Sequence, residues 1–196
     1  MNQITAFLFS ITHCVTFYLY TQIYARLRRN DIYNADKQTV DQMPLARKVT
    51  KVAFTFSTLM VLISFWVPGN TFGFYETSLL FRLGGLLLTS VACLMLKISL
   101  NQLGKNYSPL FDTHKPLFIV KAGPYRYIRH PVYLCNILII LGYVVSSSSL
   151  WVFISSLWGW GYMIHSIQKE EKYLSHEFSD YGDYQKKTWR IIPFLF

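Results

Sequence analysis

A histidine, a tyrosine and two glutamates stand at the ends of two apolar segments. His130 and Tyr133 lie three residues apart at the start of the run PVYLCNILIILGYVV, so they share one face of a predicted helix. Pro131 suits the first turn of that helix, because its missing N–H would have no partner there. Glu170 and Glu171 follow the next apolar run. If these groups lie close together, they form a pocket with a carboxylate that binds a cation or hydroxyl groups. The same pocket has hydrogen-bond donors that bind the carboxylate of a ligand.

A structural role is also open for the polar residues of this region. Arg126 and Arg129 are typical of side chains that anchor a helix end at lipid headgroups. Tyr125 and Tyr133 fit a belt of interfacial aromatic residues equally well. The two glutamates would face water if they lay on the outer side of a helix. Residue types and spacing alone leave both interpretations open.

The segments that must position these residues are apolar enough to cross a bilayer, which takes about 20 helical residues. Of the 196 residues, 52% are hydrophobic and only 15% are charged, against about 25% charged in soluble domains. We therefore predict an all-α integral membrane protein with about five transmembrane helices, at 4–24, 49–67, 78–100, 131–145 and 150–167. Only the four serines 146–149 separate the last two, which predicts a tight antiparallel hairpin. The start of one helix and the end of the other then become neighbours.

Basic residues are distributed unevenly along the chain. Lys and Arg gather in the regions 26–51, 97–129 and 169–190, whereas 68–77 and 146–149 carry none. The positive-inside rule then places the N-terminus outside and the C-terminus in the cytoplasm. The formal net charge of +9 is explained by this distribution, and nucleic-acid binding, which needs a basic patch on a soluble surface, is not expected.

The remaining segments indicate one membrane domain over 1–196, with three spans in 1–100 and a long loop, the helical hairpin and a C-terminal helix in 101–196. The N-terminal apolar stretch is interpreted as a retained span, since it has no basic region or cleavage site before it. Residues 168–184 predict an amphipathic helix that continues the fifth span. Gly159 and Gly161 are interpreted as small residues for close helix packing. The three cysteines lie in apolar segments without metal-ligand spacing, so no metal site is expected.

A resemblance covers the C-terminal half, about residues 100–194. Its motifs follow one order: LG-x-NYS at 103–108, IVKAGPYRYIRHPVY at 119–133, KEEKYL at 169–174, F-x-x-Y-x-x-Y at 178–184 and R-IIP at 190–193. This pattern resembles the isoprenylcysteine carboxyl methyltransferase family, which includes relatives of the phospholipid N-methyltransferases. The resemblance implies methyl transfer from S-adenosylmethionine at the cytoplasmic membrane face, without a Rossmann domain. It also implies a lipophilic or lipidated acceptor that enters between helices from the bilayer.

Carried over by motif, the resemblance implies a set of cofactor-binding residues. They are Leu117, Phe118, Ile119, Val120, Tyr125, His130, Pro131, Val132, Tyr133 and Glu170. The family often has an arginine four residues before the first glutamate, where this chain has Ser166. No catalytic residue is assigned, and His165 and Lys169 are candidates to replace the arginine.

The departure at Ser166 leaves the acceptor open between a carboxylate, an amine and a thiol. A phospholipid amine of the phosphatidylethanolamine type is an alternative acceptor for the same cofactor chemistry. A membrane scaffold or carrier without enzyme activity is the alternative of another class, in which the basic loops only anchor the chain. The oligomeric state is left undetermined.

Overall fold

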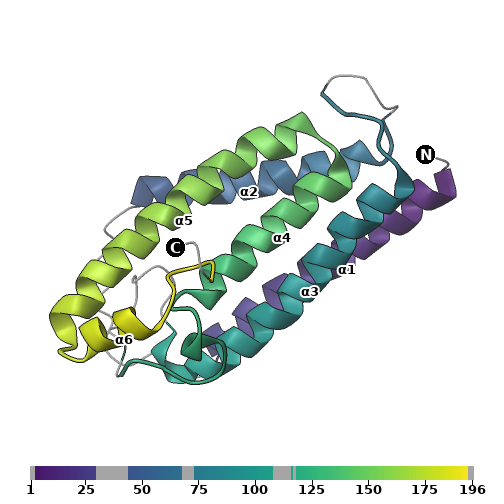
Figure 1. Cartoon of the computed structure of the whole chain (residues 1–196). Coiled ribbons are helices and arrows are strands. Elements are labelled where there is room, and N and C mark those ends of the chain that lie inside the picture. The colour runs from purple at the N-terminus through teal and green to yellow at the C-terminus, as the bar shows by residue number, and fades with distance from the viewer. Residues whose placement is uncertain (1–2, 30–43, 68–72, 108–115, 117, 194–196) are drawn as a thin grey trace.

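Long antiparallel helices make up most of the protein. The computed structural model describes residues 3–29, 44–67, 73–107, 116 and 118–193. The long helices are α1 (Gln3–Arg29), α2 (Pro44–Ser64), α3 (Leu79–Leu103), α4 (Pro131–Ser147) and α5 (Leu150–Glu177). In Figure 1, α1, α3, α4 and α5 run along one bundle, with α2 beside α5. A short helix, α6 (Tyr181–Lys187), and two 3₁₀ turns, η2 (Gly104–Asn106) and η4 (Gly123–Arg126), lie at one end.

Every predicted span is helical, and the described residues form no strand beyond isolated bridges, so the all-α prediction is confirmed. The count of five spans is not. Within the described residues, Ile4–Ala25 and Leu79–Leu103 are long and apolar enough to cross a membrane, whereas the apolar parts Val52–Ser64 and Pro131–Ser147 are shorter. The outer face of α3 is apolar: Leu80, Leu87 and Leu94 are 80%, 66% and 64% exposed. Such a stripe on a helix surface is typical of contact with lipid.

The closest helix contact lies between α3 and α4. A Cβ on Gly85 would lie 2.5 Å from the backbone nitrogen of Ser146, and one on Gly142 would lie 2.2 Å from Oγ1 of Thr89. Only glycine allows the two backbones to approach this far. The sequence prediction placed such packing at Gly159 and Gly161, and this was wrong: a Cβ on Gly159 meets only Cδ1 of Ile140 at 3.6 Å, and one on Gly161 meets nothing within 4 Å.

The predicted hairpin between α4 and α5 is present. Ser148 turns the chain with φ of 51°, in the left-handed region, and its N–H donates to the carbonyl of Val144. Arg82 of α3 is buried beside this turn and donates to the carbonyls of Ser146 and Ser147. A cation at these free carbonyls also complements the dipole of α4. The hairpin fixes the start of α4 beside the end of α5.

The tail does not form the single amphipathic helix expected over 168–184. α5 ends at Glu177, residues 178–180 turn the chain, and α6 folds back under the bundle (Figure 1). Tyr181 and Tyr184 of α6 become buried, at 1% and 6% exposure, because the turn directs this face inward. Beyond α6, residue 189 pairs with residue 128 in an isolated parallel bridge.

Candidate active site

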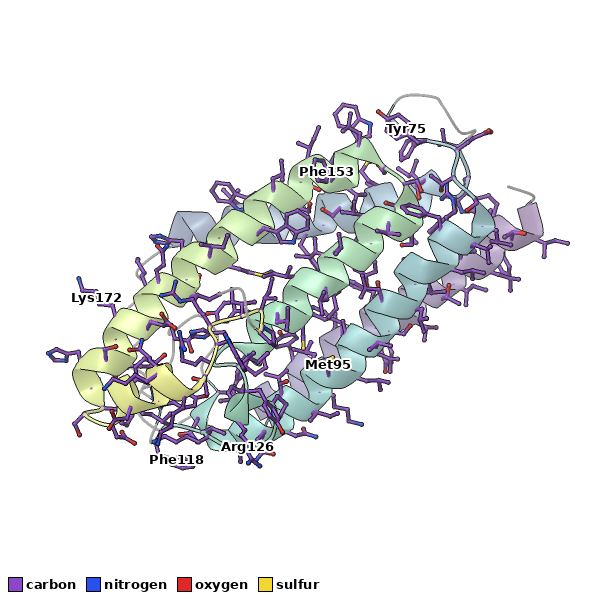
Figure 2. The ribbon with its side chains drawn as sticks, in the orientation of Figure 1. Tyr75, Met95, Phe118, Arg126, Phe153 and Lys172 are labelled. Carbon is purple, nitrogen blue, oxygen red and sulfur yellow. The ribbon has the colours of Figure 1, made fainter. Side chains whose placement is uncertain are left out.

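One cavity of about 700 Å³ runs through the bundle. Its walls come from α1, α2, residues at 103–107, residues of 116 and 118–130, α4, α5 and α6. Figure 2 places Phe118 and Arg126 at the end of the bundle that carries α6, and Tyr75 at the opposite end. Toward α6 the lining includes His130, Glu170 and Arg129, whereas deeper in the bundle it includes Ile139, Val152 and other apolar residues. The cavity therefore joins a polar end to an apolar interior.

The start of α4 and the end of α5 bring three predicted residues together. His130 is 3% exposed, and its Nδ1 lies 3.8 Å from Oε2 of Glu170. Its ring meets the ring of Tyr133 edge to face, with centroids 5.7 Å apart. All three side chains line the cavity. The convergence expected from the tight hairpin is thus present.

Glu171 points to a different set of partners. Its Oε1 accepts from Nε of Arg129 at 2.8 Å and lies 3.3 Å from Nε2 of His130, while its Oε2 lies 2.8 Å from Nη2 of Arg190. Arg129 also donates to the carbonyls of Gln185 and Thr188. Glu171 and Arg129 are 7% and 9% exposed, so the pair is buried and hydrogen-bonded on several sides. This network ties α5 to the strand-like segment after α6.

The surroundings shift the pKa values of the two carboxyl groups in opposite directions. Burial raises the pKa of Glu170, although the His130 ring and a hydrogen bond from Tyr133 oppose the rise. Burial also acts to raise the pKa of Glu171, but hydrogen bonds from His130, Arg129 and Arg190 outweigh it and lower the pKa to about 2. Glu171 is therefore a fixed structural anion, whereas Glu170 is the carboxyl group available to a ligand.

η4 sets Tyr125 in the wall. Gly123 begins this turn with φ of 59°, a conformation that favours glycine. Tyr184 holds the turn by donating its hydroxyl to the carbonyl of Tyr125 at 2.6 Å. The Tyr125 hydroxyl itself is buried, lies in the cavity wall and has no hydrogen-bond partner among the described residues. Burial, together with the nearby carboxylate of Glu170, raises its pKa.

Almost all of the predicted cofactor-binding residues lie around the same cavity. Nine of them line the cavity: Phe118, Ile119, Val120, Tyr125, His130, Pro131, Val132, Tyr133 and Glu170. Leu117 lies outside the described residues. The candidates for the missing arginine are not brought to this site: His165 and Lys169 are exposed on α5 and do not line the cavity. Ser166 is buried and donates to the carbonyl of Tyr162 within the helix.

Sequence reasoning missed several residues of the site. The sequence left open whether Arg129 anchors a helix end at lipid headgroups or belongs to the site. In the structure it is the buried partner of Glu171. Tyr20 and Tyr24 of α1 reach the cavity and hydrogen-bond to the Asn136 side chain at 3.0 and 3.3 Å. Tyr181 lines the cavity from α6. The tyrosine spacing of the F-x-x-Y-x-x-Y motif was the available signal for Tyr181, but it was used to predict a helix.

Known proteins are similar to this chain over the region that carries the site. The model of the isoprenylcysteine carboxyl methyltransferase (ICMT) family matches residues 85–176. The cobalt-zinc-cadmium resistance protein CzcN of Cupriavidus metallidurans is 32% identical over 103 residues, or 52% of this chain and 48% of that protein. The chain thus matches about half the length of CzcN.

Two methyltransferases are similar over more of the chain. The protein-S-isoprenylcysteine O-methyltransferase of Dictyostelium discoideum is 24% identical over 189 residues, which are 91% of this chain and 73% of that protein. The enzyme of the same name from Saccharomyces cerevisiae is 31% identical over 151 residues, 73% of this chain and 62% of that protein. The family match includes α4, α5 and both glutamates of the site. On this match and these relatives, the chain is similar to the ICMT family over the region that carries the site.

Proposed function

We propose that the protein is a methyltransferase that uses S-adenosylmethionine to methylate a lipophilic acceptor at the cytoplasmic face of a membrane. The observation that carries this proposal is the continuous cavity that joins the polar group of His130 and Glu170 to an apolar interior between helices. A charged donor and a lipid-soluble acceptor need such a site, because each requires a different environment. Similarity to the ICMT family and to two protein-S-isoprenylcysteine O-methyltransferases supports carboxyl methylation as the reaction type.

The polar end fits the proposed methyl donor chemically. S-adenosylmethionine carries ribose hydroxyls, an ammonium and a carboxylate, which need acceptors and donors in the wall. Glu170 supplies a carboxylate whose partners leave it 22% exposed toward the cavity. Tyr125 supplies a buried hydroxyl that finds no partner in the described part of the chain. A buried polar group without a partner is costly, so a ligand atom is its natural complement.

In such a reaction the protein itself takes little part in the making and breaking of covalent bonds. When bound, the donor supplies a sulfonium methyl group that is already electrophilic. Glu170, His130 and Tyr133 hold one side of the cavity in a fixed arrangement, and the Glu171 network keeps that arrangement rigid. Alignment of acceptor and donor then provides most of the acceleration. The apolar walls exclude water, which strengthens an anionic or amine nucleophile.

The proposed site also requires a membrane topology. We place α1 to α5 across the bilayer, with the N-terminus outside and α6 and the C-terminus in the cytoplasm. The apolar stripe on α3 and the clustering of basic residues near the α6 end support this arrangement. The polar end of the cavity then lies at the cytoplasmic interface, and an acceptor enters from the bilayer.

A phospholipid amine is the second candidate acceptor. Within the described lining, the basic side chains are Arg129 and His130, and both already contact Glu171. Neither His165 nor Lys169 replaces the family arginine at the cavity. A carboxylate acceptor therefore has no dedicated cation in this part of the wall, whereas an amine does not need one.

The acceptor is identified by its product. Purified protein is incubated with S-adenosylmethionine labelled in its methyl group and with a membrane extract, and the labelled product is identified by mass spectrometry. A base-labile methyl ester assigns a carboxylate acceptor, and a methylated ethanolamine headgroup assigns a phospholipid. Absence of a labelled product, together with no donor binding by calorimetry, would favour the scaffold or carrier alternative.

A further inference from the structure

Tyr181 occupies an unusual position at the polar end of the cavity. It belongs to α6, which lies beyond the segment that the family match covers. Its side chain is 1% exposed and lines the cavity. Its hydroxyl is buried and finds no hydrogen-bond partner among the residues that the structure describes. The phenol oxygen is thus taken out of water, and no described residue replaces the lost hydrogen bond.

The neighbouring tyrosine of the same helix makes the contrast clear. Tyr184 is buried at 6% exposure, and its hydroxyl donates to the carbonyl of Tyr125. That phenol therefore has a structural purpose, which is to hold η4. The rings of Tyr181 and Tyr184 pack with centroids 5.9 Å apart, which positions the Tyr181 ring, but this contact does not need its hydroxyl. Phenylalanine would fill the same space, so packing alone does not explain a tyrosine at position 181.

The charges near Tyr181 indicate a polar ligand. Burial raises the pKa of its hydroxyl, and the carboxylates of Glu171 and Glu170 add to the rise, whereas the Arg129 guanidinium opposes it. The hydroxyl stays protonated at neutral pH and is able to donate a hydrogen bond. Tyr125, the other cavity tyrosine with an unpartnered hydroxyl, lies in the same polar region. Two buried phenols without partners beside one ligand carboxylate form a set of donors for a bound molecule.

α6 is held firmly enough to serve as a ligand wall. Arg129 donates to the carbonyls of Gln185 and Thr188, and the Thr188 hydroxyl donates to the carbonyl of Tyr184. After α6, the Trp189 backbone pairs with Tyr127, and Arg190 reaches Glu171. The chain segment that carries Tyr181 is therefore anchored, through the residues that follow it, to residues 127–129 and to α5.

We propose that Tyr181 is a binding residue for the methyl donor, and that its hydroxyl donates a hydrogen bond to a polar group of S-adenosylmethionine. This inference rests on the proposed function. It extends the donor site from α4 and α5, within the family match, to α6, beyond it. The C-terminal segment then completes the site as well as stabilising the fold.

Tyr181→Phe tests the proposal because it removes only the hydroxyl. The donor Kd is measured by calorimetry for the full-length protein in detergent, and thermal unfolding is measured without ligand. One lost hydrogen bond should weaken donor binding about threefold to tenfold. The unliganded variant should unfold at the same temperature as the wild type or higher, since a buried unpartnered group is lost. Tyr127→Phe is the matched control, because this phenol is 60% exposed, and its donor Kd should be unchanged.

The outcomes separate this inference from the proposed function. If the wild type binds the donor and Tyr181→Phe binds it equally well, the inference is overturned and the proposed function stands. If Tyr181→Phe unfolds at a lower temperature without ligand, the hydroxyl has a structural partner and the inference is again overturned. If the wild type does not bind the donor, both are overturned. Repeating the titration with 5′-methylthioadenosine, which lacks the amino-acid end, assigns the contact: a retained difference supports the nucleoside end, and a lost one supports the amino-acid end.

Discussion

Glu170 and Glu171 follow each other in α5, yet their carboxylates serve different purposes. Glu170 faces the cavity, with Oε2 3.8 Å from Nδ1 of His130. Glu171 lies outside the cavity lining and is held by Arg129, Arg190 and the other nitrogen of His130. His130 thus stands between the two, with one ring nitrogen near each carboxylate. The EE motif combines one ligand group with one structural group.

Replacement of Glu171 should destabilise the protein. Glu171→Gln removes the charge that Arg129 and Arg190 share, and leaves a buried arginine without its anion. Breaking a buried pair in this way costs about 3 kcal/mol. We expect a lower thermal unfolding midpoint in detergent, measured by fluorescence or calorimetry. An unchanged midpoint would contradict the structural assignment of this residue.

The Glu171 carboxylate should also make stability depend on pH. Its pKa is lowered from 4.5 to about 2 in the folded protein, so the folded state holds the proton less tightly than the unfolded state. The resulting stabilisation is complete above pH 4.5 and is lost as the pH falls from 4.5 to about 2. Over this range the wild type should lose stability relative to Glu171→Gln. If the stabilities of the two proteins fall equally with pH over this range, the ion-pair network of Glu171 is contradicted.

Glycines 84 and 85 offer a matched pair for the α3–α4 contact. Gly85→Ala should destabilise the protein by about 1–3 kcal/mol, because its Cβ would meet α4 backbone atoms that have no room to move. A Cβ on Gly84 meets nothing within 4 Å, so Gly84→Ala should have no such cost. Thermal unfolding of both variants checks this. Equal effects would mean that α3 and α4 are packed less closely than described.

Filling the apolar part of the cavity should separate acceptor binding from donor binding. Gly159 lines the cavity on α5, whereas Gly161 is exposed and does not line it. Gly159→Phe should reduce methyl transfer more than tenfold, while the donor Kd stays within about twofold, because the added ring occupies apolar space. Gly161→Phe should transfer at the wild-type rate. Loss of donor binding in Gly159→Phe would contradict a separate acceptor region.

The positions of the helices and the core of the site were predictable from the sequence. Long apolar runs and the four-serine turn are local signals, and they fixed where α4 and α5 meet. The convergence of His130, Tyr133 and Glu170 followed from that one turn. The motifs supplied the other predicted binding residues of the cavity through resemblance.

What the sequence did not reveal depends on contacts between distant segments. The partners of Glu171 come from the start of α4 and from the segment after α6, about 42 residues before it and 19 after it. The turn at 178–180 contains no proline or glycine, so the tyrosine spacing was interpreted as a continuous helix. The glycines at the close contact, Gly85 and Gly142, lie in apolar runs about 57 residues apart, and only the folded structure shows that each faces the other helix.

The most direct test of the central claim is the Kd of S-adenosylmethionine for the purified full-length protein and for Glu170→Gln, measured by calorimetry. Glu177→Gln serves as a control, because this exposed carboxylate lies on the same helix and does not line the cavity. If Glu170 binds the donor, the wild type and the control should bind it equally and Glu170→Gln should bind it at least about tenfold more weakly. Equal binding by all three proteins, or no binding by the wild type, would show that Glu170 is not a donor-binding residue.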